Sequence, residues 1–288
     1  MIRSMTGYAR LEGDCSVGRV VWEMRAVNHR YLDVSLRLPE DFRRMEPDLR
    51  QLVSKQIGRG KIECSLRYRY DGAQSSELAV DTHRVQQLQQ AMDQVAHIWG
   101  PMGPSDPLRL LSFAGVIREP EDDLSPLLAT ARELFNGLLK AFDDSRLGEG
   151  ARMHDFLVER CDNIEALVAQ VRPRYQAARE QWVERLRQRA LEMKVELDPQ
   201  RFEQELAIVA QRLDVEEELS RLASHLVEVR QVLKRDKSVG RRLDFLMQEL
   251  NREANTLSSK SQDAEMTRLA VEMKVQIEQM REQVQNIE

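Results

Sequence analysis

The sequence has few cysteines and few aromatic residues, and it has no long hydrophobic run. Its three cysteines, Cys15, Cys64 and Cys161, are odd in number and far apart, which argues against a disulfide framework and a clustered zinc site. We expect them to be reduced packing residues. No stretch approaches the roughly 20 apolar residues that span a bilayer, and the first residues lack the apolar core of a signal peptide. The sequence therefore predicts a cytoplasmic protein with no membrane partner.

Several well-known catalytic motifs are also missing. The chain has no Gly-x-x-x-x-Gly-Lys loop for nucleotide phosphates, no Gly-x-Ser-x-Gly, no His-Glu-x-x-His and no Cys-x-x-Cys. These absences argue against a phosphate-binding loop, a serine hydrolase of that kind and a zinc protease. Any catalytic site must therefore be built from other residues.

Charged residues make up 32% of the 288 residues and aromatic residues only 5%, which is typical of a protein rich in charged helices. The net charge is −5, but it is unevenly distributed. Residues 1–70 carry 14 Lys and Arg against 9 Asp and Glu, whereas residues 71–152 carry 7 against 13. An anionic ligand would therefore be attracted to the first segment.

The first seventy residues alternate as strands do, and later residues follow helical spacing, so we predict an α+β fold. Strands are expected over 20–27, 31–38 and 62–68, with a helix over 41–57. From about residue 81 helices dominate: one over about 125–145, a break at 148–150, and a very long helix from there to about 194, interrupted only by Pro173, which could kink it. Asp198-Pro199 resembles a helix start, followed by a helix to about 234, a break at 236–240 and two further helices.

These elements predict two domains. The first covers residues 1–150, with an α+β core at 1–70 and helices from about 81. The second is a helical domain over residues 151–288. The break at 236–240 would let the helices on either side fold back as an antiparallel hairpin, so that their polar faces meet.

The acidic segment from Asp214 to His225 is the most informative part of the chain. On a helix, Asp214, Glu217 or Glu218, Arg221 and His225 would share a polar stripe, and Val215, Leu219, Leu222 and Leu226 a buried one. Residues 240–256 repeat this mixture of acidic and basic groups. The alternative is a solvated helix face with ordinary ion pairs.

Oxygen-rich sites of this kind suit Mg²⁺ or Mn²⁺, which could lower the pKa of a bound water and offset charge on a phosphodiester. The candidate metal ligands are Asp214, Glu217, Glu218, Glu249 and Glu253. The candidate catalytic residues are Glu217, Glu218, His225, Asp244 and Glu249. Arg221, Arg241 and Arg252 would contact phosphates beside these acids.

Two basic turns lie in the first module. Asn28-His29-Arg30 falls between two predicted strands, and Arg59-Gly60-Lys61 precedes the last one, where Gly60 can adopt a turn conformation. Such turns suit contacts with a sugar-phosphate backbone. His29 could equally be an acid or base, or a capping group.

Motifs spread over the chain resemble the YicC/YloC family. They are Met5-Thr6-Gly7-Tyr8, Arg25 to Asp33, Arg59-Gly60-Lys61, Asp214 to His225, Leu243 to Leu246, Gln248-Glu249, Arg252-Glu253, Asn255-Thr256 and Arg281 to Glu288. The resemblance implies an endoribonuclease that cleaves single-stranded or structured RNA with a divalent metal. It also implies a ring-like homo-oligomer, a hexamer. Other RNA-decay enzymes are further candidate partners. Carried over by position, Asn28, His29, Arg30, Arg59, Lys61, Arg221, Arg241, Arg252 and Asn255 become candidate RNA-binding residues.

Three other functions remain open. A metal-independent nuclease would use His29 or His225 as acid and base, with the RNA 2′-hydroxyl as nucleophile. An oligomeric RNA-binding adaptor would present RNA to another nuclease without cutting it. A coiled-coil scaffold would have no RNA partner.

Overall fold

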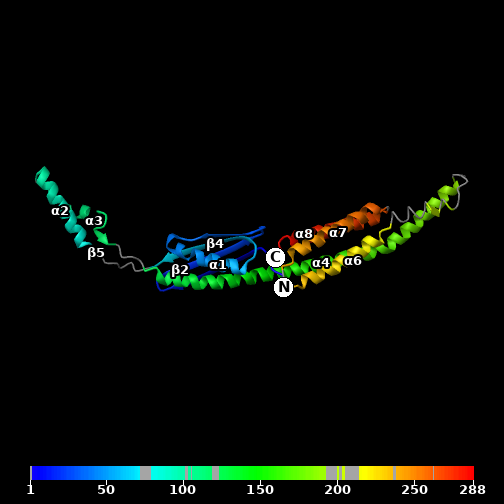
Figure 1. The fold of residues 1–288 in the computed structure, drawn as a ribbon, viewed down its shortest axis with the longest axis horizontal. Helices are drawn as coiled ribbons and strands as arrows, with labels where there is room; N and C mark the ends of the chain where they lie inside the picture. The colour runs from blue at the N-terminus through cyan, green and yellow to red at the C-terminus, as the bar shows by residue number, and fades with distance from the viewer. Residues whose placement is uncertain are drawn as a thin grey trace.

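The computed structural model describes residues 2–71, 79–100, 103–104, 106–118, 123–192, 200, 203–204, 214–235, 238–261 and 263–288. In this part of the chain a four-stranded sheet is followed by long helices, and the two regions lie end to end (Figure 1). The α+β fold predicted from the sequence is confirmed.

The sheet is formed by β1 (Gly7–Cys15), β2 (Gly18–Val27), β4 (Gly60–Tyr70) and β3 (Leu32–Arg37), in the order β1-β2-β4-β3. Pairing is antiparallel except between β3 and β4. The inward side chains of β2, such as Trp22 and Met24, are fully buried, and the Trp22 Nε1–H donates to the Ala131 carbonyl at 2.9 Å. The alternation that predicted the strands therefore places every second residue in the core.

Three of these strands agree with the sequence-based prediction, but β1 was not predicted. Its inward positions include Ala9 and Gly13, which give a weak apolar alternation. The predicted helix over 41–57 is divided into a 3₁₀ helix, η1 (Glu40–Met45), and α1 (Glu46–Gln56). Gly60 begins β4 at φ +116°, the left-handed region expected for the turn before that strand.

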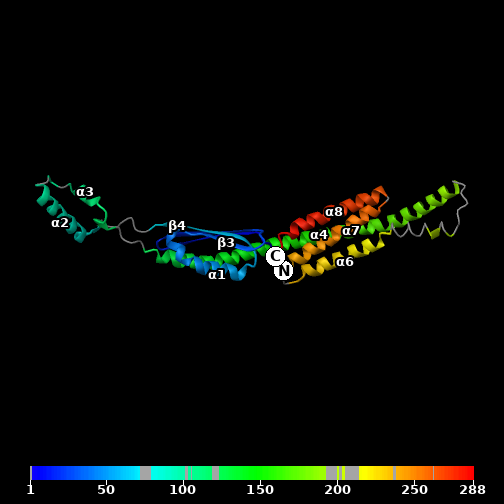
Figure 2. The same ribbon diagram turned by 45° about the horizontal axis from the view of Figure 1, so that its top comes forward.

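Helix α4 (Ser125–Glu192) is the longest element, with 68 residues and a length of roughly 100 Å. Its first part packs beneath the sheet through residues such as Phe135 and Phe142, and its later part packs on the other helices through residues such as Leu157 and Ile164. The helix continues through Pro173. One helix thus contributes to both hydrophobic cores. Figure 2 shows α4 running past the sheet and on along the other helices.

The predicted break at residues 148–150 is wrong, because α4 passes through Gly148 and Gly150 without interruption. Gly150 has a packing role instead. A Cβ atom built on it would lie 2.2 Å from the Ile2 carbonyl oxygen, so only glycine lets the first residues of the chain lie against the helix. The predicted domain boundary after residue 150 falls inside this helix.

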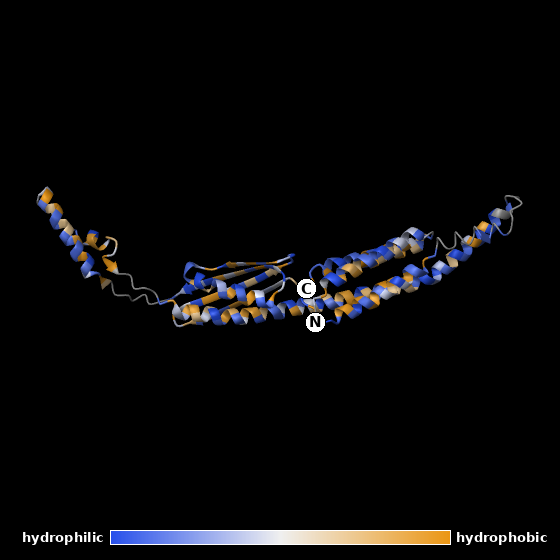
Figure 3. Ribbon diagram, viewed as in Figure 1, coloured by the Kyte–Doolittle hydropathy of each residue, from blue (hydrophilic) through white to orange (hydrophobic). Residues whose placement is uncertain are grey.

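The later part of α4 packs with α6 (Glu216–Leu233), α7 (Gly240–Lys260) and α8 (Ala264–Val284). The buried stripe predicted on α6 is confirmed, since Leu219, Leu222 and Leu226 are fully buried. Hydrophobic and hydrophilic residues alternate along these helices in Figure 3. The predicted helix start at Asp198-Pro199 lies outside the described residues.

The chain ends meet between the sheet and the helices (Figure 1). Ser4 and Ile287 form an antiparallel bridge, and the Met5 N–H donates to the Asn286 carbonyl at 2.7 Å. The guanidinium of Arg146 on α4 is 2% exposed, donates from Nε to the Ser4 carbonyl at 2.7 Å and forms an ion pair with Glu288. This arrangement attaches both chain ends to α4.

A smaller unit contains β5 (Ala79–Val80), α2 (Thr82–Trp99), α3 (Pro107–Leu111) and β6 (Ile117–Arg118). No side chain of α2 is buried against the described residues, and Ile98 and Trp99 are 86% and 88% exposed. None of the described helices is both apolar and long enough to cross a bilayer.

The environments of the cysteines predict their reactivity. All three are free thiols, Cys64 and Cys161 are buried, and burial raises the pKa of each of these two thiols to about 12. Because the thiolate is the nucleophile, both should resist a thiol reagent at pH 8 while half-buried Cys15 reacts. Timed alkylation of the folded and the urea-unfolded protein, followed by mass spectrometry, measures this. Fast labelling of Cys64 or Cys161 in the folded protein would contradict the burial.

Candidate active site

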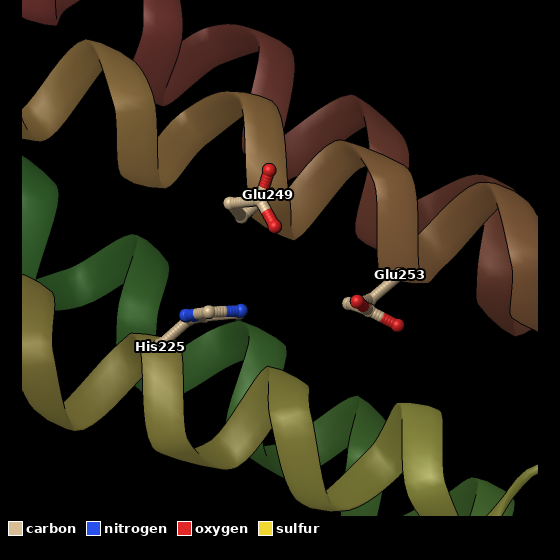
Figure 4. A group of neighbouring side chains, drawn as sticks. All are labelled: His225, Glu249 and Glu253. Carbon is tan, nitrogen blue, oxygen red and sulfur yellow. The ribbon is translucent and has the colours of Figure 1, made fainter.

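Helices α6 and α7 run antiparallel and bring one histidine and two glutamates together. One ligand atom from each of His225, Glu249 and Glu253 lies within 4.8 Å of the other two. Figure 4 shows His225 pointing from α6 towards the two carboxylates on α7. Glu249 and Glu253 are four residues apart and therefore share one face of α7. Glu253 is buried, whereas His225 and Glu249 are partly exposed, so the group is accessible from one side.

Arg221 lies beside this group, one helical turn before His225. Its guanidinium pairs with Glu217 on the same helix, and with Glu253 across the hairpin at 3.4 Å. The pKa of Arg221 is raised, first by the Coulombic attraction of Glu217 and then by the hydrogen bond and the charge of Glu253. The side chain remains 52% exposed, so a permanent cation faces solvent next to the buried acid.

The other acids of the predicted stripe lie elsewhere. Glu217 is 68% exposed, and neither it nor Glu218 belongs to the group of three. Glu218 is 8% exposed and accepts from Lys260 Nζ at 2.7 Å. Asp214 precedes α6 instead of lying on it, so its predicted position on the helix is wrong. Its carboxylate accepts from the Glu216 N–H at 3.0 Å and from the Tyr175 hydroxyl at 3.2 Å.

The remaining candidates on α7 lie along the exposed side of that helix. Asp244 accepts from the Gln248 side chain at 3.0 Å, and Arg252 is 3.9 Å from Glu249. Asn255 donates to the Asn251 side chain at 2.9 Å, and Arg241 is exposed in the first turn.

In the first module, two candidate RNA-binding residues contact the end of the chain. Asn28 Nδ2 donates to the Gln285 carbonyl at 2.8 Å, and Arg59 donates to the Ile287 carbonyl. Gly240 makes this contact possible, since a Cβ there would lie 2.3 Å from the Ile287 oxygen. These two side chains join the sheet to the helices, which their sequence positions did not indicate.

Three further candidates lie at the same end of the sheet. His29 Nδ1 is 2.9 Å from the Tyr31 carbonyl oxygen, and the Arg30 guanidinium lies 5.3 Å from the centre of the Tyr31 ring. Lys61 Nζ is 3.6 Å from Glu63. Arg30 and Tyr31 are exposed and together offer a cation and an aromatic ring to solvent.

The group of three has the chemistry of a divalent-cation site. Two carboxylates and one imidazole nitrogen converge, and the buried Glu253 has only an arginine as its ion-pair partner among the described residues. Carboxylates suit both Mg²⁺ and Mn²⁺, and of these two ions the transition metal Mn²⁺ is the one that accepts an imidazole nitrogen more readily. The residues therefore fit the predicted metal, with His225 as a ligand, a role that sequence reasoning did not give it. The sequence feature that could have indicated this role is the position of His225, one helical turn after Arg221 on the polar stripe that faces α7.

By fold, the chain is an α+β protein whose helical part carries this cluster of acidic and imidazole groups. Residues 2–155 match the family model of the N-terminal region of YicC-like endoribonucleases, and residues 171–288 match that of their C-terminal region. The chain is 44% identical to a protein of Haemophilus influenzae named probable endoribonuclease YicC. It is 29% identical to a protein of the same name from Clostridioides difficile. Both alignments cover 100% of this chain and of the relative.

The chain therefore belongs to the YicC-like endoribonuclease family, as its motifs predicted.

Proposed function

We propose that this protein is a cytoplasmic, homo-oligomeric endoribonuclease that cuts RNA phosphodiester bonds with a divalent metal bound by His225, Glu249 and Glu253. The observation that carries the proposal is the convergence of these three ligand groups beside Arg221, in a chain of an endoribonuclease family. Single-stranded and structured RNA are both candidate substrates.

The protein groups have separate roles in this proposal. The imidazole and the two carboxylates hold the ion, which would supply a lower pKa for a water and positive charge opposite the phosphodiester. Arg221 can exchange either of its carboxylate partners for a phosphate oxygen, because half of its side chain is exposed. Without such a cation the acids would repel RNA.

An oligomer is supported by the apolar side chains that α2 exposes, including Ile98 and Trp99. A contiguous exposed apolar surface often marks a protein interface. Static light scattering measures the mass in solution, and a monomer at micromolar concentration would remove this part of the proposal. RNA and other RNA-decay enzymes remain the proposed partners.

The test is cleavage of an end-labelled, structured RNA by the purified full-length protein, with Mn²⁺, with Mg²⁺ and with chelator. We expect internal cuts that require metal, and Mn²⁺ should act at lower concentration than Mg²⁺ because of the histidine ligand. Cuts that persist in chelator and leave cyclic phosphate ends would favour the 2′-hydroxyl mechanism with His225 as acid or base. Salt-sensitive binding without cuts would favour the adaptor.

A further inference from the structure

A shallow groove lies between α7 and α8, beside the group of three. Its lining residues are Met247, Gln248, Asn251, Arg252, Asn255, Thr256 and Arg281. Most of them are three or four residues apart on α7, so they share a face that adjoins the face of Glu249 and Glu253. Anything bound along this groove would lie next to the proposed metal site.

The charge of the lining suits an anion. It contains two arginines and no carboxylate, in a chain with a net charge of −5. The two guanidiniums have long ion pairs, with 3.9 Å between Arg252 and Glu249 and 3.4 Å between Arg281 and Glu278. The buried Nε of Arg281 has no hydrogen-bond partner within the described ranges. Both arginines can therefore donate hydrogen bonds to a phosphate without losing a short ion pair.

The remaining polar groups are uncharged. Gln248, Asn251 and Asn255 offer amide donors and acceptors, and Thr256 offers a hydroxyl. Such groups pair with base edges and with the ribose 2′-hydroxyl, the features that distinguish an RNA single strand. Met247 lies beneath the groove and is fully buried, so the polar side chains form the surface that a ligand would meet.

We propose that this groove binds the single-stranded segment of the RNA substrate adjacent to the bond that is cut. Arg252 and Arg281 contact backbone phosphates, and the amides of α7 contact bases and ribose. This inference rests on the proposed function, and it names single-stranded RNA as the substrate form at the site. It also gives a role to Arg281, which the sequence analysis named within a motif but not as a site residue.

The experiment measures binding of a fluorescent 12-nucleotide RNA, and of DNA with the same sequence, to the full-length protein in chelator, over a range of salt concentrations. One variant carries Arg252→Gln and Arg281→Gln, with Arg268→Gln on α8 as its control. A second carries Asn251→Ala and Asn255→Ala, with Gln231→Ala on α6 as its control. Circular dichroism and thermal unfolding verify the fold of each variant.

The arginine variant should change the salt dependence of RNA binding, whereas the asparagine variant should change the preference for RNA over DNA. Loss of two phosphate contacts should weaken RNA binding about tenfold and reduce the slope of log K against log salt by about 1.4, since each single-strand phosphate contributes about 0.7. The asparagine variant should weaken RNA binding about tenfold, weaken DNA binding less, and leave the salt slope unchanged. The controls should bind as the unaltered protein does.

The proposal is overturned if both folded groove variants bind RNA with unaltered affinity. If the unaltered protein still cuts RNA in that case, the nuclease stands and only the groove is wrong. If the unaltered protein neither binds nor cuts RNA, the nuclease and the groove are both wrong.

Discussion

Glu253→Gln should abolish metal-dependent RNA cleavage, with a loss of more than about 100-fold in kcat/KM, because even residues that only orient a metal ligand contribute 10- to 100-fold. Glu253 is the buried carboxylate of the group of three, and an amide in its place removes one negative charge from the ion's surroundings. Mn²⁺ affinity, measured by electron paramagnetic resonance without RNA, should fall as well. The amide keeps the size of the side chain, so the helices should remain folded.

Glu217→Gln is the matched control for this prediction. Glu217 also contacts Arg221, but it is 68% exposed and outside the group of three. Its replacement should leave Mn²⁺ affinity within about twofold and retain most of the cleavage, since an exposed ion pair contributes little. Equal losses of Mn²⁺ affinity and cleavage in the two variants would show that Glu217 on α6 acts together with the acids of α7. The metal site would then not be limited to His225, Glu249 and Glu253.

Arg146→Met should destabilise the protein by about 3 kcal/mol, the lower end of the range for removing one partner of a buried ion pair. Arg146 is 2% exposed and contacts both chain ends, through the Ser4 carbonyl and the Glu288 carboxylate. Methionine fills much of the same volume, so the loss reports charge and hydrogen bonds rather than a cavity. Urea unfolding followed by circular dichroism measures the free energy of unfolding.

Arg132→Met provides the comparison on the same helix. Arg132 forms its ion pair with Asp48 at 3.1 Å, but both side chains are more than 60% exposed. Its replacement should cost less than about 1 kcal/mol. If the two variants lose the same stability, the buried contact at the chain ends does not stabilise the fold as we infer.

The alternation of residues predicted the fold well wherever one face of an element is strongly apolar. The strands around Trp22 and Leu66 and the buried stripe of α6 were recognised for this reason. Strand β1 was missed because small residues occupy its inward positions. The sequence analysis interprets Gly150 as a helix break, but the glycine is needed for a close contact with Ile2. Because Ile2 is far from Gly150 in the sequence, local spacing could not reveal this contact.

The candidate site was predicted at the level of segments and less well at the level of single acids. Spacing showed that α6 and α7 each carry acids and could meet as a hairpin. Which acids face each other depends on the register of the two helices, and that register is set by packing of residues such as Leu222 and Leu250. Sequence alone therefore could not separate Glu253, which faces Arg221, from Glu218, which faces Lys260.

The shared helix α4 has a consequence for how this protein can be divided. The two family models end at residue 155 and resume at residue 171, which suggests two pieces that could be produced separately. Both limits fall inside α4, and Cys161 and Ile164 between them are fully buried in the helical core. A fragment that stops at 155 would lack these side chains, and one that starts at 171 would expose the surface they cover. The two regions are separable in sequence comparison, but the limits of both models cut a helix whose side chains contribute to both hydrophobic cores.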